Sequence, residues 1–479
     1  MYIYGIISIE KLYVSIEIST EFLYNILGEV FNMIFKRKIY DKLVEWKNSP
    51  IRDSALLIEG ARRIGKTTIV KEFAKNFYSD NYLYIDFKLA SLELMQIFND
   101  LKNIEDFFAS LFLMCGKSIE RGGLVIFDEV QYCPKAREAI KYLVADNRFD
   151  YIETGSLISI KENTENIQIP SEERKIEMYP MDFEEFLWAQ NDYVTANYIK
   201  DSYNNMKAID EKMHKVIMSR FRRYMALGGM PKVLDMFFQT NSYLEADKIK
   251  KDILSLYKDD LRKHDNKYHT SCELLFNSIP FQLAKESTRF FVSSAIDEKR
   301  VSQLEKSLFD LTDYKLVNVV YNFKDPSSFF ELTKEEGLFK IYCVDTGLLV
   351  TELLKDNDAD INEAYKKIIF DEINYNFGSI FESLSCQILV AKGIKPYYHT
   401  FKYGDGVQEK RYEIDFMYQR NLLEYAIEVK STKRFETKSL VALKNKYQNI
   451  RINTFVVSTK TYNKEINEYN IPIYMLPFI

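Results

Sequence analysis

The stretch EGARRIGKTTIV, residues 59–70, decides how the first large part of this chain is expected to fold. It fits the pattern G-x-x-x-x-G-K-S/T with Gly60, Gly65, Lys66 and Thr67. In such a loop, glycines let backbone N–H groups curl around phosphate oxygens. The lysine reaches the β- and γ-phosphates, and the threonine hydroxyl ligates magnesium. Because four fixed positions also match by chance, the neighbouring sequence has to support this interpretation.

The segments on both sides of the loop have the required patterns. SALLIEG, residues 54–60, is an apolar run of strand length, and TTIVKEFAKNF, residues 67–77, has apolar residues at helical spacing. A strand that leads through a glycine-rich turn into a helix places the unpaired N–H groups of the helix against the phosphates. The sequence therefore predicts a nucleotide-binding loop.

A second buried strand supplies the acids that such a site needs. Residues 124–127 of GGLVIFDEVQ are continuously apolar, as in a strand covered on both faces, and Asp128 and Glu129 follow at its tip. Asp128 is predicted to hold the magnesium through water, and Glu129 to orient the attacking water. A strand that ends in solvated acids is the alternative for this piece alone, but the order of the two pieces favours ATP binding.

A third strand, DYIETGSLIS at residues 150–159, ends in small hydroxyl residues. Either Thr154 or Ser156 is expected to touch the γ-phosphate, the alternative being a turn with a helix cap. The predicted cofactors are ATP and Mg²⁺. The predicted nucleotide contacts are Gly60, Ala61, Arg62, Arg63, Ile64, Gly65, Lys66, Thr67, Thr68, Asp128, Thr154 and Ser156.

Length and composition limit the remaining possibilities. A chain of 479 residues is too long for one core and suits about three domains. A formal net charge of −5 excludes a polycation that coats nucleic acid. The five scattered cysteines form no C-x-x-C pair and there are four histidines, which argues against zinc and predicts free thiols in a cytoplasmic protein.

The N-terminal residues are not expected to enter a membrane. The apolar stretch at residues 22–35 is shorter than a membrane span and contains Glu29, and residues 1–32 lack a secretory signal. Met33 begins MIFKRKIYDKLVEW, which is expected to be the opening helix of the first domain. Residues 1–32 are therefore interpreted as a dispensable extension.

Five motifs together carry a resemblance to a known family. The order GARRIGKTT, LVIFDEVQ, ETGS, MYPMDFEEF and ALGGMPKVL resembles a widespread prokaryotic family of AAA-type ATPases that carry a C-terminal domain of unknown function. The resemblance runs from about Met33 to the C-terminus. It implies a γ-phosphate-sensing arginine before the tyrosine-proline motif, here Arg174, although Glu173 stands where the family usually has glycine. A solvated surface arginine is the alternative.

The expected domains follow from these patterns. Residues 33–195 are predicted to form a P-loop ATPase core with a doubly wound parallel α/β sheet, and residues 196–268 a helical lid. In residues 269–350, helices followed by the strands NVVYNF and LFKIYCVD suggest a winged-helix-like module. Such a module places a helix in DNA or packs against protein.

Residues 370–479 hold a second set of carboxylates. A helix carries Glu382, and two strands place Glu413 beside Asp415 and Glu428 beside Lys430, because residues two apart share one face. The order α-β-β-β-α-β resembles the PD-(D/E)XK nuclease fold. That resemblance implies a divalent cation held by Glu382, Asp415 and Glu428, with Lys430 acting on water beside a scissile phosphate.

Three interpretations of this last domain stay open: metal-dependent cleavage of DNA, a nuclease-like fold kept only for binding, and a hairpin with solvated charges. Residues 379–479 carry fifteen Lys and Arg against ten Asp and Glu, which suits contact with a phosphate backbone. The chain is thus expected to be an ATPase that gates a DNA-directed nuclease-like domain, or a switch whose C-terminal domain only binds a partner. A homo-oligomer is possible if Arg174 acts on a neighbouring subunit.

Overall fold

The computed structural model describes residues 34–50, 53–156, 167–264, 269–283, 290–291, 301–355, 360–370, 378–404, 409–432, 435–465 and 468–479. The predicted extension at residues 1–32 lies outside the described residues, as does the end of the third predicted strand at residues 157–159. No helix in the described part of the chain is both long and apolar enough to cross a lipid bilayer. All five cysteines are free thiols.

The first sheet has five strands, all parallel, in the order β2-β3-β4-β1-β5. Its strands are β1 (Ala55–Glu59), β2 (Tyr82–Asp86), β3 (Leu124–Asp128), β4 (Asp150–Gly155) and β5 (Glu173–Glu177). The helices of this part are α2 (Ile39–Lys47), α3 (Lys66–Tyr78), α4 (Leu92–Gln96), η2 (Ile97–Asn99), α5 (Ile104–Cys115), η3 (Val130–Tyr132) and α6 (Pro134–Asp146).

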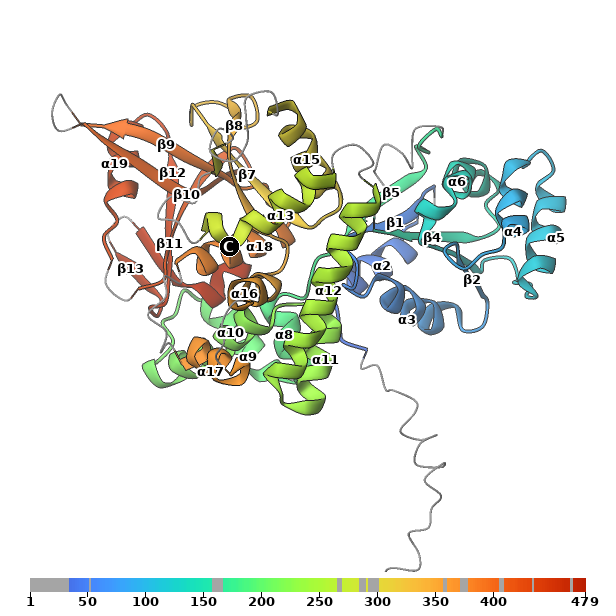
Figure 1. Ribbon diagram of the computed structural model, residues 1–479, viewed down its shortest axis with the longest axis horizontal. Coiled ribbons are helices and arrows are strands. Elements are labelled where there is room, and N and C mark those ends of the chain that lie inside the picture. The colour runs from blue at the N-terminus through green and yellow to red at the C-terminus, as the bar shows by residue number, and fades with distance from the viewer. Residues whose placement is uncertain are drawn as a thin grey trace, which may run out of the picture. The chain divides into compact units, whose positions relative to one another are not determined.

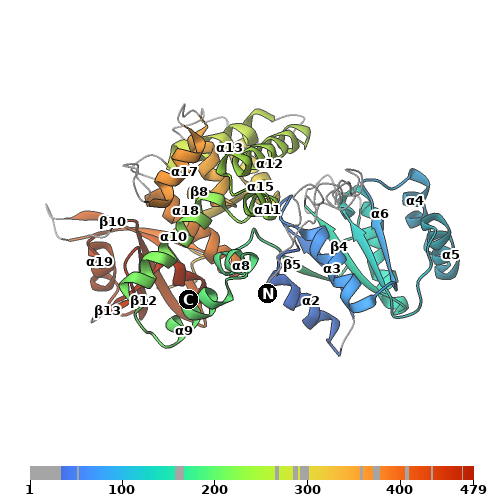
Figure 2. The same ribbon diagram turned by 90° about the horizontal axis from the view of Figure 1, so that it is seen from below.

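Helices cover both faces of this sheet. Leu56 and Ile58 of β1 belong to one buried cluster with residues of α3, whereas Leu57 belongs to another with residues of α5 and α6. Figure 2 shows α3 and α6 on opposite faces of the strands. Strands β1 and β3 are buried along their whole length, as their unbroken apolar runs predict. The prediction of a parallel α/β core covered on both faces is confirmed.

A helical segment follows, and its labels can be followed in Figure 1. It comprises α8 (Phe183–Ala189), α9 (Tyr193–Asn204), α10 (Glu211–Leu227), α11 (Pro231–Thr240) and α12 (Tyr243–His264). Helix α10 ends at the glycine pair 228–229, because Gly228 has a φ of 81°, in the left-handed region that favours glycine. Pro231 then occupies the first turn of α11, where its missing N–H costs nothing.

The second sheet has nine strands in the order β13-β14-β12-β11-β10-β9-β7-β8-β6. The elements of this part are α13 (His269–Leu283), β6 (Phe290–Phe291), α15 (Val301–Asp313), β7 (Val317–Phe323), β8 (Lys334–Cys343), α16 (Thr346–Leu354), α17 (Ile361–Phe370), α18 (Gly378–Ala391), β9 (Tyr397–Tyr403), β10 (Lys410–Arg420), β11 (Leu423–Lys430), α19 (Lys438–Lys446), β12 (Ile452–Ser458), β13 (Asn463–Glu465), β14 (Glu468–Pro472) and η6 (Ile473–Phe478). From α18 to β12 the predicted order α-β-β-β-α-β is confirmed.

The two strands predicted as a wing are β7 and β8, and they pair with each other in antiparallel fashion. Strand β7 also pairs in parallel with β9, so strands from the predicted segments 269–350 and 370–479 share one sheet. The winged-helix and nuclease-like assignments stay predictions.

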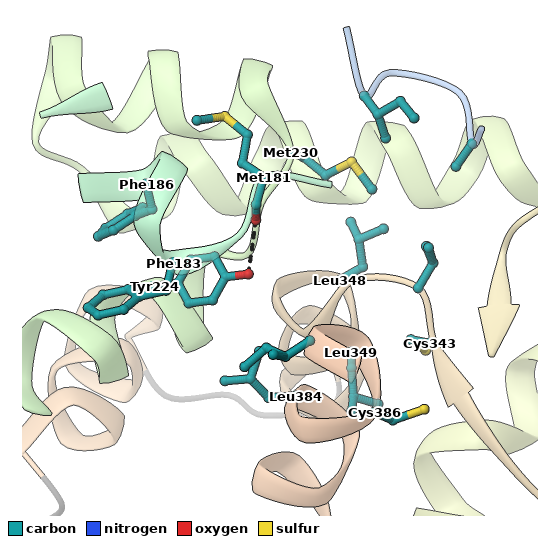
Figure 3. Close-up of a cluster of buried hydrophobic side chains, with 14 of the residues drawn as sticks. Met181, Phe183, Phe186, Tyr224, Met230, Cys343, Leu348, Leu349, Leu384 and Cys386 are labelled. Carbon is teal, nitrogen blue, oxygen red and sulfur yellow. Dashed lines mark hydrogen bonds between the residues drawn. The ribbon is translucent and has the colours of Figure 1, made fainter. Parts of the chain in front are cut away.

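A buried cluster joins the helical segment to the second sheet (Figure 3). It brings together side chains of α8, α10, α16 and α18, namely Phe183, Phe186, Tyr224, Leu348, Leu349, Leu384 and Cys386. The one polar group that Tyr224 brings into this cluster is satisfied, because its hydroxyl donates to the Met181 carbonyl at 2.9 Å. The cluster therefore buries an aromatic ring without leaving its hydroxyl unpaired.

A carboxylate beside this cluster joins three distant segments. Asp345 Oδ2 accepts from the Gly229 backbone N–H at 2.6 Å, and its Oδ1 caps α16 by accepting from the Leu348 N–H at 3.0 Å. The Gly229 carbonyl in turn accepts from the Met181 N–H at 2.8 Å. Residues 181, 229 and 345 are thus connected through the backbone of one glycine.

We predict that Gly229→Ala destabilises the whole protein. A Cβ at this position would lie 2.1 Å from the Met181 carbonyl oxygen and 2.6 Å from its nitrogen, and backbone atoms cannot move aside cheaply. The expected loss in the free energy of unfolding is roughly 3 kcal/mol or more, measured by urea denaturation. Gly337→Ala is the matched control, because its Cβ would meet nothing within 4 Å. Equal midpoints for the two variants would contradict the proposed close contact.

Candidate functional site

The loop between β1 and α3 needs glycine at both of its fixed positions. Gly65, directly before α3, has a φ of 95°, which strains any residue that carries a side chain. At Gly60 the constraint is space, since a Cβ would lie 2.3 Å from the Met178 carbonyl oxygen and 2.6 Å from Ile64 Cδ1. The loop therefore turns tightly and presents its backbone at the start of α3.

Lys66, the first residue of α3, is buried inside this loop. Its ammonium donates to the carbonyl oxygens of Gly60 and Ala61 at 2.8 and 2.9 Å. Burial lowers the pKa of Lys66 to about 8, against the raising effects of Glu129 and Asp128. The loop thus encloses one cationic side chain whose hydrogen-bond partners are neutral carbonyls.

Asp128, at the end of β3, lies against the start of α3. Thr67 Oγ1 donates to its Oδ2 at 2.9 Å, and the hydroxyl of Tyr84 donates to the same oxygen at 2.6 Å. The Thr154 hydroxyl, at the end of β4, donates to Oδ1. Since Thr67 and Asp128 offer hard oxygen donors side by side, these two residues fit a magnesium ion.

Glu129 begins a turn at the tip of β3. Its φ of 54° is left-handed, which is uncommon for a residue with a side chain and recurs at functional sites. Its N–H hydrogen-bonds to Thr154 Oγ1 at 3.4 Å, and Gln131 Nε2 donates to its Oε2 at 2.5 Å. Sequence reasoning missed Gln131, although it lies only two residues beyond Glu129.

Arg62 connects the loop to α12. Its guanidinium pairs with Asp260 at 2.7 Å and reaches Ser156 Oγ at 3.4 Å. The Tyr257 hydroxyl donates to the Arg62 carbonyl at 2.8 Å. The predicted contact Ser156 therefore lies beside Arg62, and the predicted lid helix contacts the loop through two residues that the sequence did not single out.

The remaining predicted loop residues differ in exposure. Ala61 and Ile64 are buried, whereas the side chains of Arg63 and Thr68 are exposed. Arg63 also has a left-handed backbone, with a φ of 67°.

Arg37, which sequence reasoning missed, holds the backbone of the loop between β1 and α3. Its guanidinium donates to the carbonyls of Ile64 at 2.7 Å and Tyr179 at 2.6 Å and lies 3.2 Å from Glu185 Oε1. In a planar trans peptide the carbonyl and the next N–H point in opposite directions. Holding the Ile64 carbonyl therefore turns the Gly65 N–H away from Arg37. Nothing in the local sequence pattern of residues 33–46 marks this arginine.

Arg174 is not brought together with the loop of its own chain. It is exposed on the edge strand β5 and lies opposite Leu56, whereas the loop begins after Glu59 at the other end of β1. Arg174 therefore lies away from the loop of its own chain.

In the second sheet, the structure brings Asp415 and Glu428 together. Phe416 pairs with Ile427, so the preceding Asp415 faces Glu428 across the two strands. Asp415 Oδ2 accepts from the Val429 N–H at 2.7 Å, and Lys430 lies 2.6 Å from Glu428 Oε1.

Glu382, the third predicted metal ligand, also lies close enough to affect the pKa of Asp415. Burial, followed by the nearby carboxylates of Glu382 and Glu428, raises the pKa of Asp415 to about 7, while Lys340 acts in the opposite direction. The three predicted metal ligands, Glu382, Asp415 and Glu428, are therefore neighbours.

Lys340 of β8 also lies in this cluster, and sequence reasoning did not single it out. It pairs with Glu382 Oε1 at 2.6 Å and with Glu413 Oε1 at 2.8 Å. Its signal was visible: it is the one charged residue in the apolar strand run LFKIYCV. Within the described ranges, no group of three or more His, Cys, Asp or Glu side chains is arranged to hold a metal ion.

The parallel sheet, the loop and Asp128 define the first part of the chain as a P-loop domain of the AAA type. Residues 52–187 match a family profile described as "AAA domain". Residues 218–359 and 377–476 match two further profiles, described as "Domain of unknown function (DUF8612)" and "Domain of unknown function (DUF4143)".

Two curated proteins resemble the chain. An uncharacterized protein of Methanocaldococcus jannaschii is 21% identical over 480 residues, covering 96% of this chain and 94% of the relative. An uncharacterized protein of Haemophilus influenzae is 24% identical over 201 residues, covering 39% of this chain and 48% of the relative. Among solved structures, the Aeropyrum pernix ORC1 protein in complex with DNA matches with a TM-score of 0.29 and 10% identity, over 68% of this chain and 94% of that one.

Proposed function

We propose that the chain binds ATP with Mg²⁺ and hydrolyses it at the loop of residues 60–67. The observation that carries the proposal is the contact of Thr67 with Asp128, 2.9 Å apart, beside the buried ammonium of Lys66. The site thus combines the cation of Lys66, the oxygen donors of Thr67 and Asp128 and the N-terminus of α3. These groups lie at the carboxyl edge of a parallel sheet, where ligands of such folds bind.

Each side chain has a role in this proposal. Lys66 holds the β- and γ-phosphates, and Thr67 and Asp128 hold the magnesium, which when bound would neutralise charge on the phosphate oxygens. The hydroxyls of Thr154 and Tyr84 fix the Asp128 carboxylate. Glu129, held by Gln131, orients the attacking water and accepts its proton.

Substitutions should separate binding from hydrolysis. Lys66→Ala loses a charge-assisted contact, so ATP affinity is expected to fall roughly ten- to hundredfold in calorimetric titration. Glu129→Gln should bind ATP like the parent and lose most hydrolysis, because its carboxylate acts on the water during the chemical step. Lys75→Ala, an exposed lysine on the same helix, is the control and should change neither quantity. Hydrolysis by Glu129→Gln at the parent rate would remove Glu129 from the mechanism.

We propose further that α12 transmits the nucleotide state. Near its C-terminal end, Tyr257 and Asp260 contact Arg62 of the loop. Lys258 pairs with Glu352 of α16 at 2.8 Å, and the buried Lys250 donates to the Tyr365 hydroxyl of α17 at 2.6 Å. One helix thus touches the loop, α16 and α17, and bound phosphates would compete with Asp260 for Arg62.

The C-terminal domain that would receive this signal has two candidate functions. Asp415, Glu428 and Lys430 come together in the second sheet, which favours a nuclease-like, DNA-directed domain gated by ATP. Lys340 neutralises Glu382, which favours the alternative of a switch whose C-terminal domain only binds a protein or nucleic-acid partner. Incubation with plasmid and linear DNA, with Mg²⁺ or Mn²⁺ and with or without ATP, separates them. A metal- and ATP-dependent cut product supports the first, and retention of DNA without a cut product supports the second.

The contact between the loop and α12 gives the test of transmission. Asp260→Asn frees Arg62 for the phosphates, so ATP should bind roughly fivefold tighter, the equivalent of about 1 kcal/mol. In the parent, ATP should change amide hydrogen exchange in α16, and in Asp260→Asn that change should be lost. Asp259→Asn, a neighbouring carboxylate that faces Arg262, is the matched control. An unchanged response of α16 in Asp260→Asn would refute this route.

Arg174 is proposed to act on the nucleotide of a neighbouring subunit. In that arrangement ATPase activity per chain rises with protein concentration, and Arg174→Ala subunits lower the activity of parent subunits mixed with them. Arg121→Ala, another exposed arginine, should have no such effect. Activity that is independent of concentration, together with a silent Arg174→Ala, would leave Arg174 as surface charge.

A further inference from the structure

We infer that Lys340 is the permanent counter-cation of the acidic cluster formed by Glu382, Glu413, Asp415 and Glu428, and that this cluster holds no divalent metal ion. The inference does not rest on the ATPase proposal. It concerns only what the second sheet contains, and it bears on which of the two C-terminal functions is open to the chain.

The position of Lys340 is the first argument. Its side chain is 1% exposed, and its ammonium lies 2.6 Å from Glu382 Oε1 and 2.8 Å from Glu413 Oε1. Burying an ammonium or a carboxylate costs much less free energy when the two are paired, so Lys340 and these two glutamates stabilise one another. Glu382 comes from α18 and Glu413 from β10, so one lysine on β8 connects three elements.

The second argument is that one oxygen of each of Glu382, Asp415 and Glu428 already has a partner. Tyr342, two residues from Lys340 and on the same face of β8, donates to Glu382 Oε1 at 2.5 Å. That oxygen therefore accepts from both Tyr342 and Lys340.

The other carboxylates are engaged as well. Asp415 Oδ2 accepts the Val429 N–H, and Glu428 Oε1 pairs with Lys430 at 2.6 Å. A magnesium or manganese ion that used these same oxygens would have to displace the donors that they already accept from.

Charge repulsion is the third argument. A divalent ion bound by Glu382 and Asp415 would lie close to the Lys340 ammonium, and like charges in a buried site repel strongly. The Lys340 ammonium also lies over the ring of Tyr398, 5.2 Å from the ring centroid. The residues present therefore do not fit the metal that the nuclease resemblance implies.

The test titrates Mn²⁺ into the full chain without nucleotide, using calorimetry and the electron paramagnetic resonance signal of free Mn²⁺. The parent and Asp415→Asn should give the same isotherm. Lys340→Met, which replaces the ammonium by an apolar chain of similar length, should gain one site, and adding Asp415→Asn should remove it. A site in the parent that Asp415→Asn abolishes would overturn the inference, as would a folded Lys340→Met that gains no site.

Lys340→Met leaves Glu382 and Glu413 without a buried cation and so has its own risk of not folding. The triple variant Lys340→Met, Glu382→Gln, Glu413→Gln removes the charges on both sides. If the single variant fails to fold and the triple variant folds, measured by circular dichroism and thermal melting, Lys340 is the counter-cation of these two carboxylates. Failure of both variants would mean that Lys340 serves another purpose and would overturn the inference.

Discussion

The carboxylate of Asp345 is the point on which the arrangement of the chain depends. It is fully buried, and burial raises its pKa, yet backbone N–H groups of Gly229 and Leu348 surround it. A buried carboxylate of this kind is tolerated only where donors are fixed around it. The donors belong to the turn after α10 and to the start of α16, so the two segments cannot separate without leaving the carboxylate unpaired.

This junction is also connected to the loop. Met181 hydrogen-bonds to Gly229, and the strand pairing of β5 with β1 leads from Met178 back to Glu59. Pro231, two residues beyond Gly229, would lie 3.6 Å from a Cβ on Gly65. Gly60 of the loop and Gly229 of the junction are required for the same reason, since the backbone of Met178 and that of Met181 pass too close for a side chain.

The sequence predicted what is encoded locally. The apolar runs of β1 and β3, the glycine spacing of the loop and the acids at the tip of β3 are consecutive, so their pattern defined both the sheet and the position of Asp128. The partners of Arg37 and Lys340 could not be assigned from local sequence. The two carbonyls that Arg37 donates to are 27 and 142 residues away, and Glu382 is 42 residues from Lys340. Arg174 shows the same limit, since its distance from the loop follows from a strand register that no local pattern contains.

The buried ammonium groups of Lys66 and Lys340 differ in what an incoming ligand would meet. The ammonium of Lys66 donates to neutral carbonyls, so exchanging one of them for a phosphate oxygen adds an attraction between opposite charges. The ammonium of Lys340 donates to carboxylates, so a metal ion would have to displace a charge that is already compensated. Lys66, with its neutral partners, is therefore ready for an anion, whereas Lys340, with its carboxylate partners, stabilises the fold. The same residue type in two buried places thus supports a ligand site in the first sheet and a closed ion-pair cluster in the second.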